Sequence, residues 1–177
     1  MKRRFQSKKR TTPDGTVPMD TALKFLSSRA RTVREVERHL DERQFGEVEI
    51  METVQRLEEL NLLDDRAYAR DFIETRLATK PVSRAHLSEQ LYQHEIPRDI
   101  IDEALAAVTD ETELASARGV AAKYLRQFAA EPDEARYERT LQRLLARGYS
   151  FDTARAAMEG CVAAETDEET DEGDDPE

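Results

Sequence analysis

The feature that most constrains the fold is one apolar pattern that recurs at a long and nearly constant spacing. Counting 5, 10, 14 and 17 residues forward from Leu40, Leu91 or Leu144 reaches an apolar residue every time, and these leucines are 51 and then 53 residues apart. Because only 38% of the chain is hydrophobic, a pattern with apolar residues at all fifteen positions indicates a structural repeat. The positions are Leu40, Phe45, Ile50, Val54, Leu57, Leu91, Ile96, Ile101, Leu105, Val108, Leu144, Tyr149, Ala154, Met158 and Cys161.

A second pattern lies upstream of each anchor leucine and repeats at the same distance. It consists of three pairs with a spacing of 51 residues between successive pairs: Ala22 and Leu26, Ile73 and Leu77, Tyr124 and Phe128. The two additional residues of the third copy are expected in a connecting loop near residues 129–133, because loops tolerate insertions best. The chain therefore contains three copies of one unit.

Each copy has the periodicity of helices. In the first copy we predict helices at residues 19–28, 33–43 and 47–59, and no stretch alternates as a half-buried strand would. Thr32 with Glu35, and Asp110 with Glu113, have the spacing of capping boxes at helix starts. The predicted fold class is all-α, with three tandem three-helix repeats.

The predicted organisation has two tails around these repeats. Residues 1–19 read as a disordered basic tail and residues 165–177 as a disordered acidic tail, because residues 1–10 carry six bases and no acid and residues 165–177 carry nine acids and no base. The three-helix repeats are assigned to residues 20–63, 64–109 and 110–164.

Composition argues against several functional classes. The net charge of −11 does not fit a protein whose affinity comes mainly from neutralising phosphates. We expect no cofactor, no metal and no enzymatic activity, because the sequence lacks a glycine-rich phosphate loop, a His-Glu-x-x-His motif and a partner for Cys161. The single cysteine favours the cytoplasm, and no apolar run approaches the ~18 residues that a membrane helix needs.

Two adjacent acids, Asp64 and Asp65, lie between the first and second repeats. We interpret them as a helix cap followed by a packed face that includes Tyr68 and Ala69, rather than as a catalytic pair. Adjacent carboxylates at a helix start point in different directions, whereas a catalytic pair must converge on one cleft.

Basic residues gather around the same junction between the first two repeats. They form either a solvated, salt-bridged surface or a contact site for phosphates or for the acids of a partner protein. These candidate contact residues are Arg29, Arg31, Arg34, Arg66, Arg70, Arg76, Lys80 and Arg84.

The ordered series of motifs resembles the RecX family, whose members modulate the RecA recombinase. The resemblance covers about residues 20–160 and rests on Ala22-Leu-Lys-Phe-Leu-Ser-Ser-Arg29, Leu63-Asp-Asp-Arg-Ala-Tyr-Ala69 and Leu144-Leu-Ala-Arg-Gly-Tyr-Ser150. It implies an elongated, curved protein that binds along the groove of a recombinase filament on single-stranded DNA and limits filament extension, ATP hydrolysis and strand exchange. We expect a monomer that reaches the DNA through the filament.

A different hypothesis is a winged-helix DNA-binding regulator. Residues 32–40 followed by residues 54–63 look like its two-helix core. Against it stand the missing strand pair, the threefold recurrence of the pattern and the acidity of the proposed recognition helix at residues 47–59, where five glutamates face one arginine.

Overall fold

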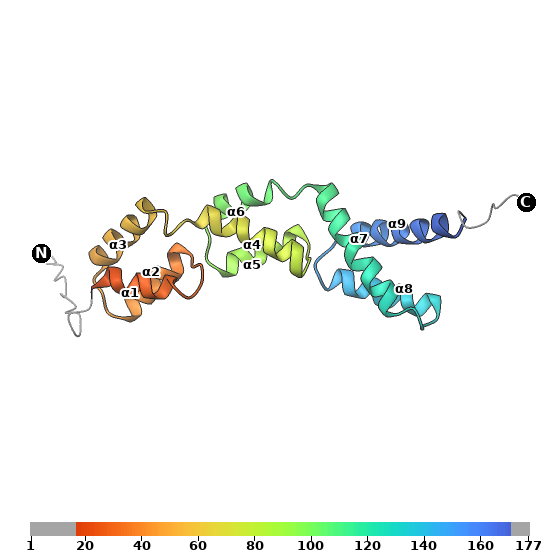
Figure 1. The fold of residues 1–177 in the computed structure, drawn as a ribbon, viewed down its shortest axis with the longest axis horizontal. Helices are drawn as coiled ribbons and strands as arrows, with labels where there is room; N and C mark the ends of the chain where they lie inside the picture. The colour runs from red at the N-terminus through yellow and green to blue at the C-terminus, as the bar shows by residue number, and fades with distance from the viewer. Residues whose placement is uncertain (1–16, 171–177) are drawn as a thin grey trace, which may run out of the picture.

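A computed structural model describes residues 17–170, with side chains described to residue 161. This part of the chain contains nine helices and no strand (Figure 1). The helices are α1 (Pro18–Leu26), α2 (Val33–Glu42), α3 (Glu47–Glu59), α4 (Asp65–Thr79), α5 (Arg84–Gln93), α6 (Arg98–Leu105), α7 (Asp110–Gln127), α8 (Asp133–Leu145) and α9 (Phe151–Thr170).

The helices form three groups of three along an elongated array (Figure 1). We call α1–α3 unit 1, α4–α6 unit 2 and α7–α9 unit 3. Within the described part of the chain, every helix pair in extensive contact belongs to a single unit. The predicted fold class is confirmed.

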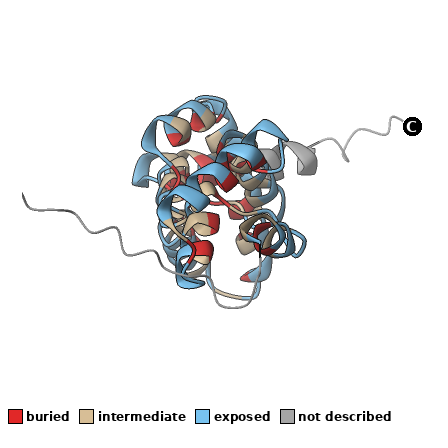
Figure 2. Ribbon diagram, turned by 90° about the vertical axis from the view of Figure 1, so that its left-hand side faces the viewer, coloured by how far each residue is buried: buried red, intermediate tan, exposed pale blue. Residues whose placement is uncertain are grey.

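Each unit has a hydrophobic core of its own. Thirteen of the fifteen repeat positions are buried, and the other two, Ile50 and Cys161, are partly buried and pack against the cores of units 1 and 3. Buried residues lie on the inner faces of the helices and exposed residues on the outer faces (Figure 2). The periodicity of the sequence therefore identified core positions in each of the three units.

The predicted tail boundaries differ from the observed helix ends. Helix α1 begins at Pro18, where the fixed φ of proline suits the first turn, so residues 18 and 19 are helical. Helix α9 extends to Thr170, beyond the predicted limit at residue 164. The remaining residues of both predicted tails, 1–16 and 171–177, lie outside the described part of the chain.

The two additional residues of the third copy were predicted in a loop, but the extension is helical. Helix α8 has 13 residues, whereas its counterparts α2 and α5 have 10 each. The connection that precedes α8 therefore does not contain the whole insertion. An extra turn at the start of a helix preserves the register of the core residues that follow it.

The polar residues predicted to cap the helix starts do so, with one exception. The Thr32 hydroxyl accepts a hydrogen bond from the backbone N–H of Glu35 at 3.2 Å. The cap of α7 is Thr109, which accepts from the N–H of Thr112 at 3.1 Å, and not Asp110 as predicted. A hydroxyl one residue upstream replaces the expected carboxylate.

The turn between the second and third helices of each unit contains a residue with positive φ at an equivalent position. These residues are Gln44 (φ 67°), Glu95 (φ 59°) and Gly148 (φ 82°). An apolar core residue follows each of them, so the left-handed residue directs the chain back into the core. Only the third copy has glycine there, the residue that adopts this conformation without steric cost.

Candidate interaction site at the joints between units

The two aspartates between units 1 and 2 have separate structural roles. Asp64 caps its own helix: one carboxylate oxygen accepts from the N–H groups of Arg66 at 2.8 Å and Ala67 at 3.0 Å. The Asp65 carboxylate accepts a hydrogen bond of 2.9 Å from the backbone N–H of Val33. Val33 is the first residue of α2 in unit 1. One aspartate therefore starts α4, and the other joins α4 to α2.

Asp65 is the buried member of the pair, with 8% of its surface exposed. Burial raises the pKa of its carboxyl above the ordinary value of 3.8, the Val33 hydrogen bond lowers this pKa, and the neighbouring Asp64, Glu37 and Glu35 raise it further. The predicted interpretation of a cap with a packed face is consistent with this geometry. Ala69 is fully buried in the core of unit 2, and Tyr68 packs against that core.

Two substitutions of Asp65 should distinguish the contribution of its hydrogen bond to stability from the contribution of its charge. Asp65→Ala should lower the free energy of unfolding by about 1–2 kcal/mol, because Val33 loses its acceptor. Asp65→Asn keeps an acceptor oxygen without a buried charge, so its stability at pH 7 should stay within about 0.5 kcal/mol of the parent or exceed it.

The pH dependence gives a second measurement. Because the folded-state pKa of Asp65 is raised, its contribution to stability is highest below the unfolded pKa and is lost as pH rises through the folded pKa. Urea unfolding between pH 4 and 7 should therefore show that the parent protein loses this stability as pH rises and that the Asp65→Asn variant does not. Equal pH slopes in the parent and the variant would contradict the assignment.

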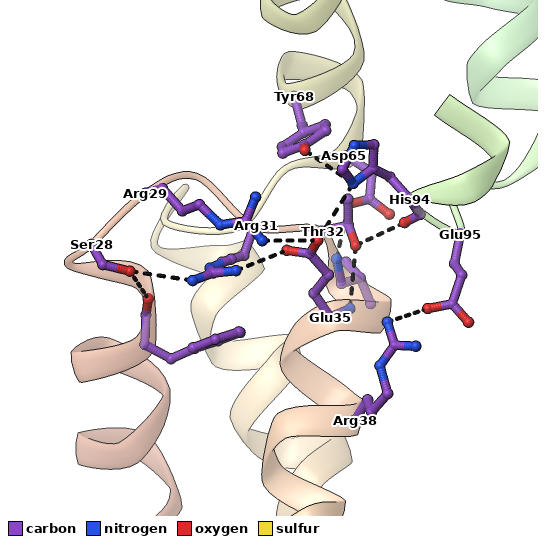
Figure 3. A network of polar contacts seen from close by, with 12 residues as sticks. Ser28, Arg29, Arg31, Thr32, Glu35, Arg38, Asp65, Tyr68, His94 and Glu95 are labelled. Carbon is purple, nitrogen blue, oxygen red and sulfur yellow. Dashed lines mark hydrogen bonds and ion pairs between the residues drawn. The ribbon is translucent and has the colours of Figure 1, made fainter. Parts of the chain in front are cut away.

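A polar network completes the joint between units 1 and 2 (Figure 3). The Thr32 hydroxyl donates to the backbone carbonyl of His94 at 3.1 Å, across 62 positions of sequence. The His94 ring nitrogen Nδ1 lies 3.4 Å from the Glu35 carboxylate and 3.4 Å from the Tyr68 hydroxyl. Glu35, which the capping-box pattern assigned to its own helix start, therefore faces unit 2 and the arginines beside it.

An ion pair flanks the network on the outside. Arg38 of α2 pairs with Glu95, the left-handed residue that follows α5 (Figure 3). Within unit 2, the Arg66 guanidinium pairs with Glu103 of α6 at 2.9 Å. A shallow open depression of about 340 Å³ lies between these two units beside Asp64 and Asp65.

The joint between units 2 and 3 repeats this arrangement. The Glu113 carboxylate of α7 accepts from the N–H of Arg84, the first residue of α5, at 2.8 Å. Arg84 stands 51 residues after Val33, so both joints hold the first N–H of a middle helix with an acid from the next unit. The backbone N–H of Ser83 also donates to the carbonyl of Arg147 at 3.0 Å.

Three of the eight predicted basic contact residues contribute to the packing of a unit or to a joint between units. Arg31 lies 4.0 Å above the Phe25 ring and 3.7 Å from the Glu35 carboxylate. Arg76 donates through Nε to Gln90 at 2.8 Å. Arg84 donates to the carbonyl of Val108 and to the Asp110 carboxylate.

The other five predicted residues lie at the surface. Arg29, Arg34 and Arg66 form ion pairs with Glu35, Glu37 and Glu103, and each of these arginine side chains is more than half exposed. Arg70 and Lys80 are exposed, and among the described residues neither side chain has an ion-pair or hydrogen-bond partner. The structure therefore divides the predicted set, and in the described part of the chain Arg70 and Lys80 are the two members without such a partner.

The site residues predicted from the sequence do not include His94, Glu113 or Arg147. Their partners are far away in the chain, and no local pattern marks them. The repeat itself contains a signal, because His94 and Arg147 are equivalent positions 53 residues apart and both offer a backbone carbonyl to the preceding unit. Comparing the copies position by position would identify them.

Other kinds of site find no support in the described part of the chain. Residues 17–161 contain no group of three or more His, Cys, Asp or Glu side chains placed to hold a metal. No helix described by the structure is long and apolar enough to cross a membrane. The absence of strands from residues 17–170, and the exposed glutamates of α3, also disfavour the winged-helix hypothesis.

The architecture defines a helical-repeat protein, in which stacked units present an extended surface. Its residues 19–57, 64–105 and 111–158 match the models of the first, second and third three-helix domains of RecX. The chain belongs to the RecX family.

Individual relatives agree with this assignment. The chain is 35% identical over 148 residues to the regulatory protein RecX of Chlorobaculum tepidum, covering 84% of this chain and 90% of that protein. It is 28% identical over 150 residues to the regulatory protein RecX of Leuconostoc mesenteroides, covering 85% of this chain and 56% of that protein. The crystal structure of RecX from Lactobacillus salivarius superposes with a TM-score of 0.73 at 25% identity, covering 82% of this chain and 95% of that one.

Proposed function

We propose that this chain is a non-catalytic modulator of a RecA-type recombinase. It binds the recombinase filament on single-stranded DNA and limits filament extension, ATP hydrolysis and strand exchange. The protein acts as a monomer in the cytoplasm, where its single cysteine stays reduced. It reaches the DNA through the filament.

The observation that carries this proposal is the architecture of three separate cores joined by polar contacts in one elongated array. Such an array presents three helical units one after another, and a filament offers subunits at regular intervals. Simultaneous binding of several units gains affinity through effective concentration, even where each contact is weak. Membership of a family whose relatives are named regulatory proteins agrees with a binding role.

The cations of unit 2 are our candidate contacts with the filament. Arg70 and Lys80 are exposed and lack partners among the described residues, so an incoming carboxylate or phosphate displaces no existing ion pair. Arg31, Arg76 and Arg84 are poor candidates for mutagenesis, because their loss would disturb the packing of the units or their joints.

The test is the single-strand-DNA-dependent ATPase rate of the cognate recombinase, titrated with this protein. We expect suppression well below one modulator per recombinase. The double variant Arg70→Gln/Lys80→Gln should weaken inhibition about tenfold, because it loses two charge contacts that contribute about 0.7 kcal/mol each to binding.

The matched control is Arg98→Gln/Arg155→Gln, which removes the same charge at exposed positions in α6 and α9. It should inhibit like the parent protein. An equal loss in both variants would show that only net charge matters. No inhibition by the folded parent at a stoichiometric ratio would overturn the proposed function.

A further inference from the structure

The outer face of α3 carries large apolar side chains that no described residue covers. Val48 is 61% exposed and Met51 is 60% exposed, whereas Val54 and Leu57 of the same helix are buried in the core of unit 1. Val48 and Met51 lie three residues apart and therefore share one face. Two adjacent exposed apolar side chains offer a contact area for a ligand.

Acids surround this apolar pair. Glu47, Glu52 and Glu58 are exposed, and none has an ion-pair or hydrogen-bond partner among the described residues. By contrast, Glu49 caps its own helix through the N–H of Gly46, and Glu59 pairs with Arg56. We call Glu47, Val48, Met51, Glu52 and Glu58 the α3 outer face. A basic segment that also contains an apolar side chain complements this face in charge and in hydrophobicity.

The N-terminal segment of the chain has this composition. Residues 1–10 contain six bases and no acid, with Met1 and Phe5 among them. The segment enters the described structure at Val17, directly before α1, and α1 packs against α3 at the same end of the array (Figure 1). Sixteen residues span up to about 50 Å when extended, whereas the 13 residues of α3 measure about 20 Å, so the segment can reach the whole face.

We propose that residues 1–10 dock on the α3 outer face of the same chain. The lysines and arginines face Glu47, Glu52 and Glu58, and Phe5 contacts Val48 and Met51. A short tether gives an effective concentration in the millimolar range, so weak contacts suffice for occupancy. Docking covers an exposed apolar pair and withholds the basic segment from polyanions. It is independent of the proposed recombinase contact in unit 2.

Carbodiimide cross-linking of the full chain tests the docking, because it joins a lysine to a carboxylate only in direct contact. The chain has six lysines, and three of them, Lys2, Lys8 and Lys9, lie in the segment. We expect their cross-links to concentrate on Glu47, Glu52 and Glu58. The yield should fall at about 1 M NaCl, where the Debye length is about 3 Å.

A substitution that leaves every lysine and every acid in place tests the apolar contact. Phe5→Ser should lower the yield of these cross-links about threefold, since the ring loses its burial against Val48 and Met51. The matched control is Phe151→Ser, which removes a phenylalanine that is 56% exposed at the start of α9. It should leave the yield unchanged.

Two outcomes would overturn the proposal. One is an even distribution of cross-links over exposed acids of all units, including Asp99, Asp102 and Glu103 of α6, a helix without exposed large apolar residues. The other is cross-linking between chains rather than within one chain, detected by mixing isotopically light and heavy protein. Neither outcome would bear on the ATPase test of the proposed function.

Discussion

Replacing Gly148 by alanine should lower the free energy of unfolding by about 2–4 kcal/mol, one of the largest single-residue effects expected in this protein. Gly148 has φ +82°, where a side chain is strained. A Cβ atom there would also lie 2.6 Å from the Ser83 hydroxyl and 3.1 Å from the His86 Cβ. Ser83 is buried and caps the start of α5, so the strain would act on the joint between units 2 and 3.

Urea unfolding followed by circular dichroism measures this effect. The matched control is Gly119→Ala in the exposed part of α7, where an added Cβ would meet nothing within 4 Å. That substitution should raise stability by about 0.5–1 kcal/mol, because alanine favours helices. A Gly148→Ala variant as stable as the parent would show that the turn relaxes and that the joint does not depend on close backbone approach.

Truncation of Leu91 is the second substitution with a large expected effect. Leu91 is fully buried in the core of unit 2, and Leu91→Ala should cost about 2–5 kcal/mol through lost burial and a cavity. Because each unit has its own core, the loss should remain largely local. In a repeat protein each unit is stabilised by its own contacts and by its nearest neighbours.

Amide hydrogen exchange shows which part of the Leu91→Ala variant loses stability. Protection should fall mainly in residues 64–109 and remain in the cores of units 1 and 3. The control is Leu145→Ala, which truncates a leucine that is 41% exposed and should change stability by about 0.5 kcal/mol or less. Uniform loss of protection over all nine helices would contradict local unfolding and show strong coupling through the joints.

The joints connect these energetic predictions with the proposed function. A rigid joint fixes the spacing between the surfaces of neighbouring units, and binding to a filament at several points requires that spacing to match. Buried groups such as Asp65 and Thr32 define the relative position of units 1 and 2 by single hydrogen bonds. We therefore expect joint variants such as Asp65→Ala to weaken filament binding even where each unit remains folded.

The sequence by itself determined the helical units, the positions of their cores and membership of the family. These properties follow from local rules: apolar periodicity defines which face of a helix is buried, and Thr32, Ser83 and Asp64 mark helix starts through short-range hydrogen bonds. Helix ends were less predictable, as the extended start of α8 and the cap of α7 show, because neighbouring residues compete for these roles.

Only the tertiary structure decided what the polar residues of the joints do. Asp64 and Asp65 are adjacent and chemically identical, yet one caps its own helix and the other holds a helix 32 positions away. The sequence likewise grouped Arg70 with Arg84, although Arg84 joins units 2 and 3 and Arg70 remains exposed. The physical reason is that a charged side chain takes its role from the groups that folding brings within hydrogen-bonding distance, and this sequence contains no local pattern that identifies those groups.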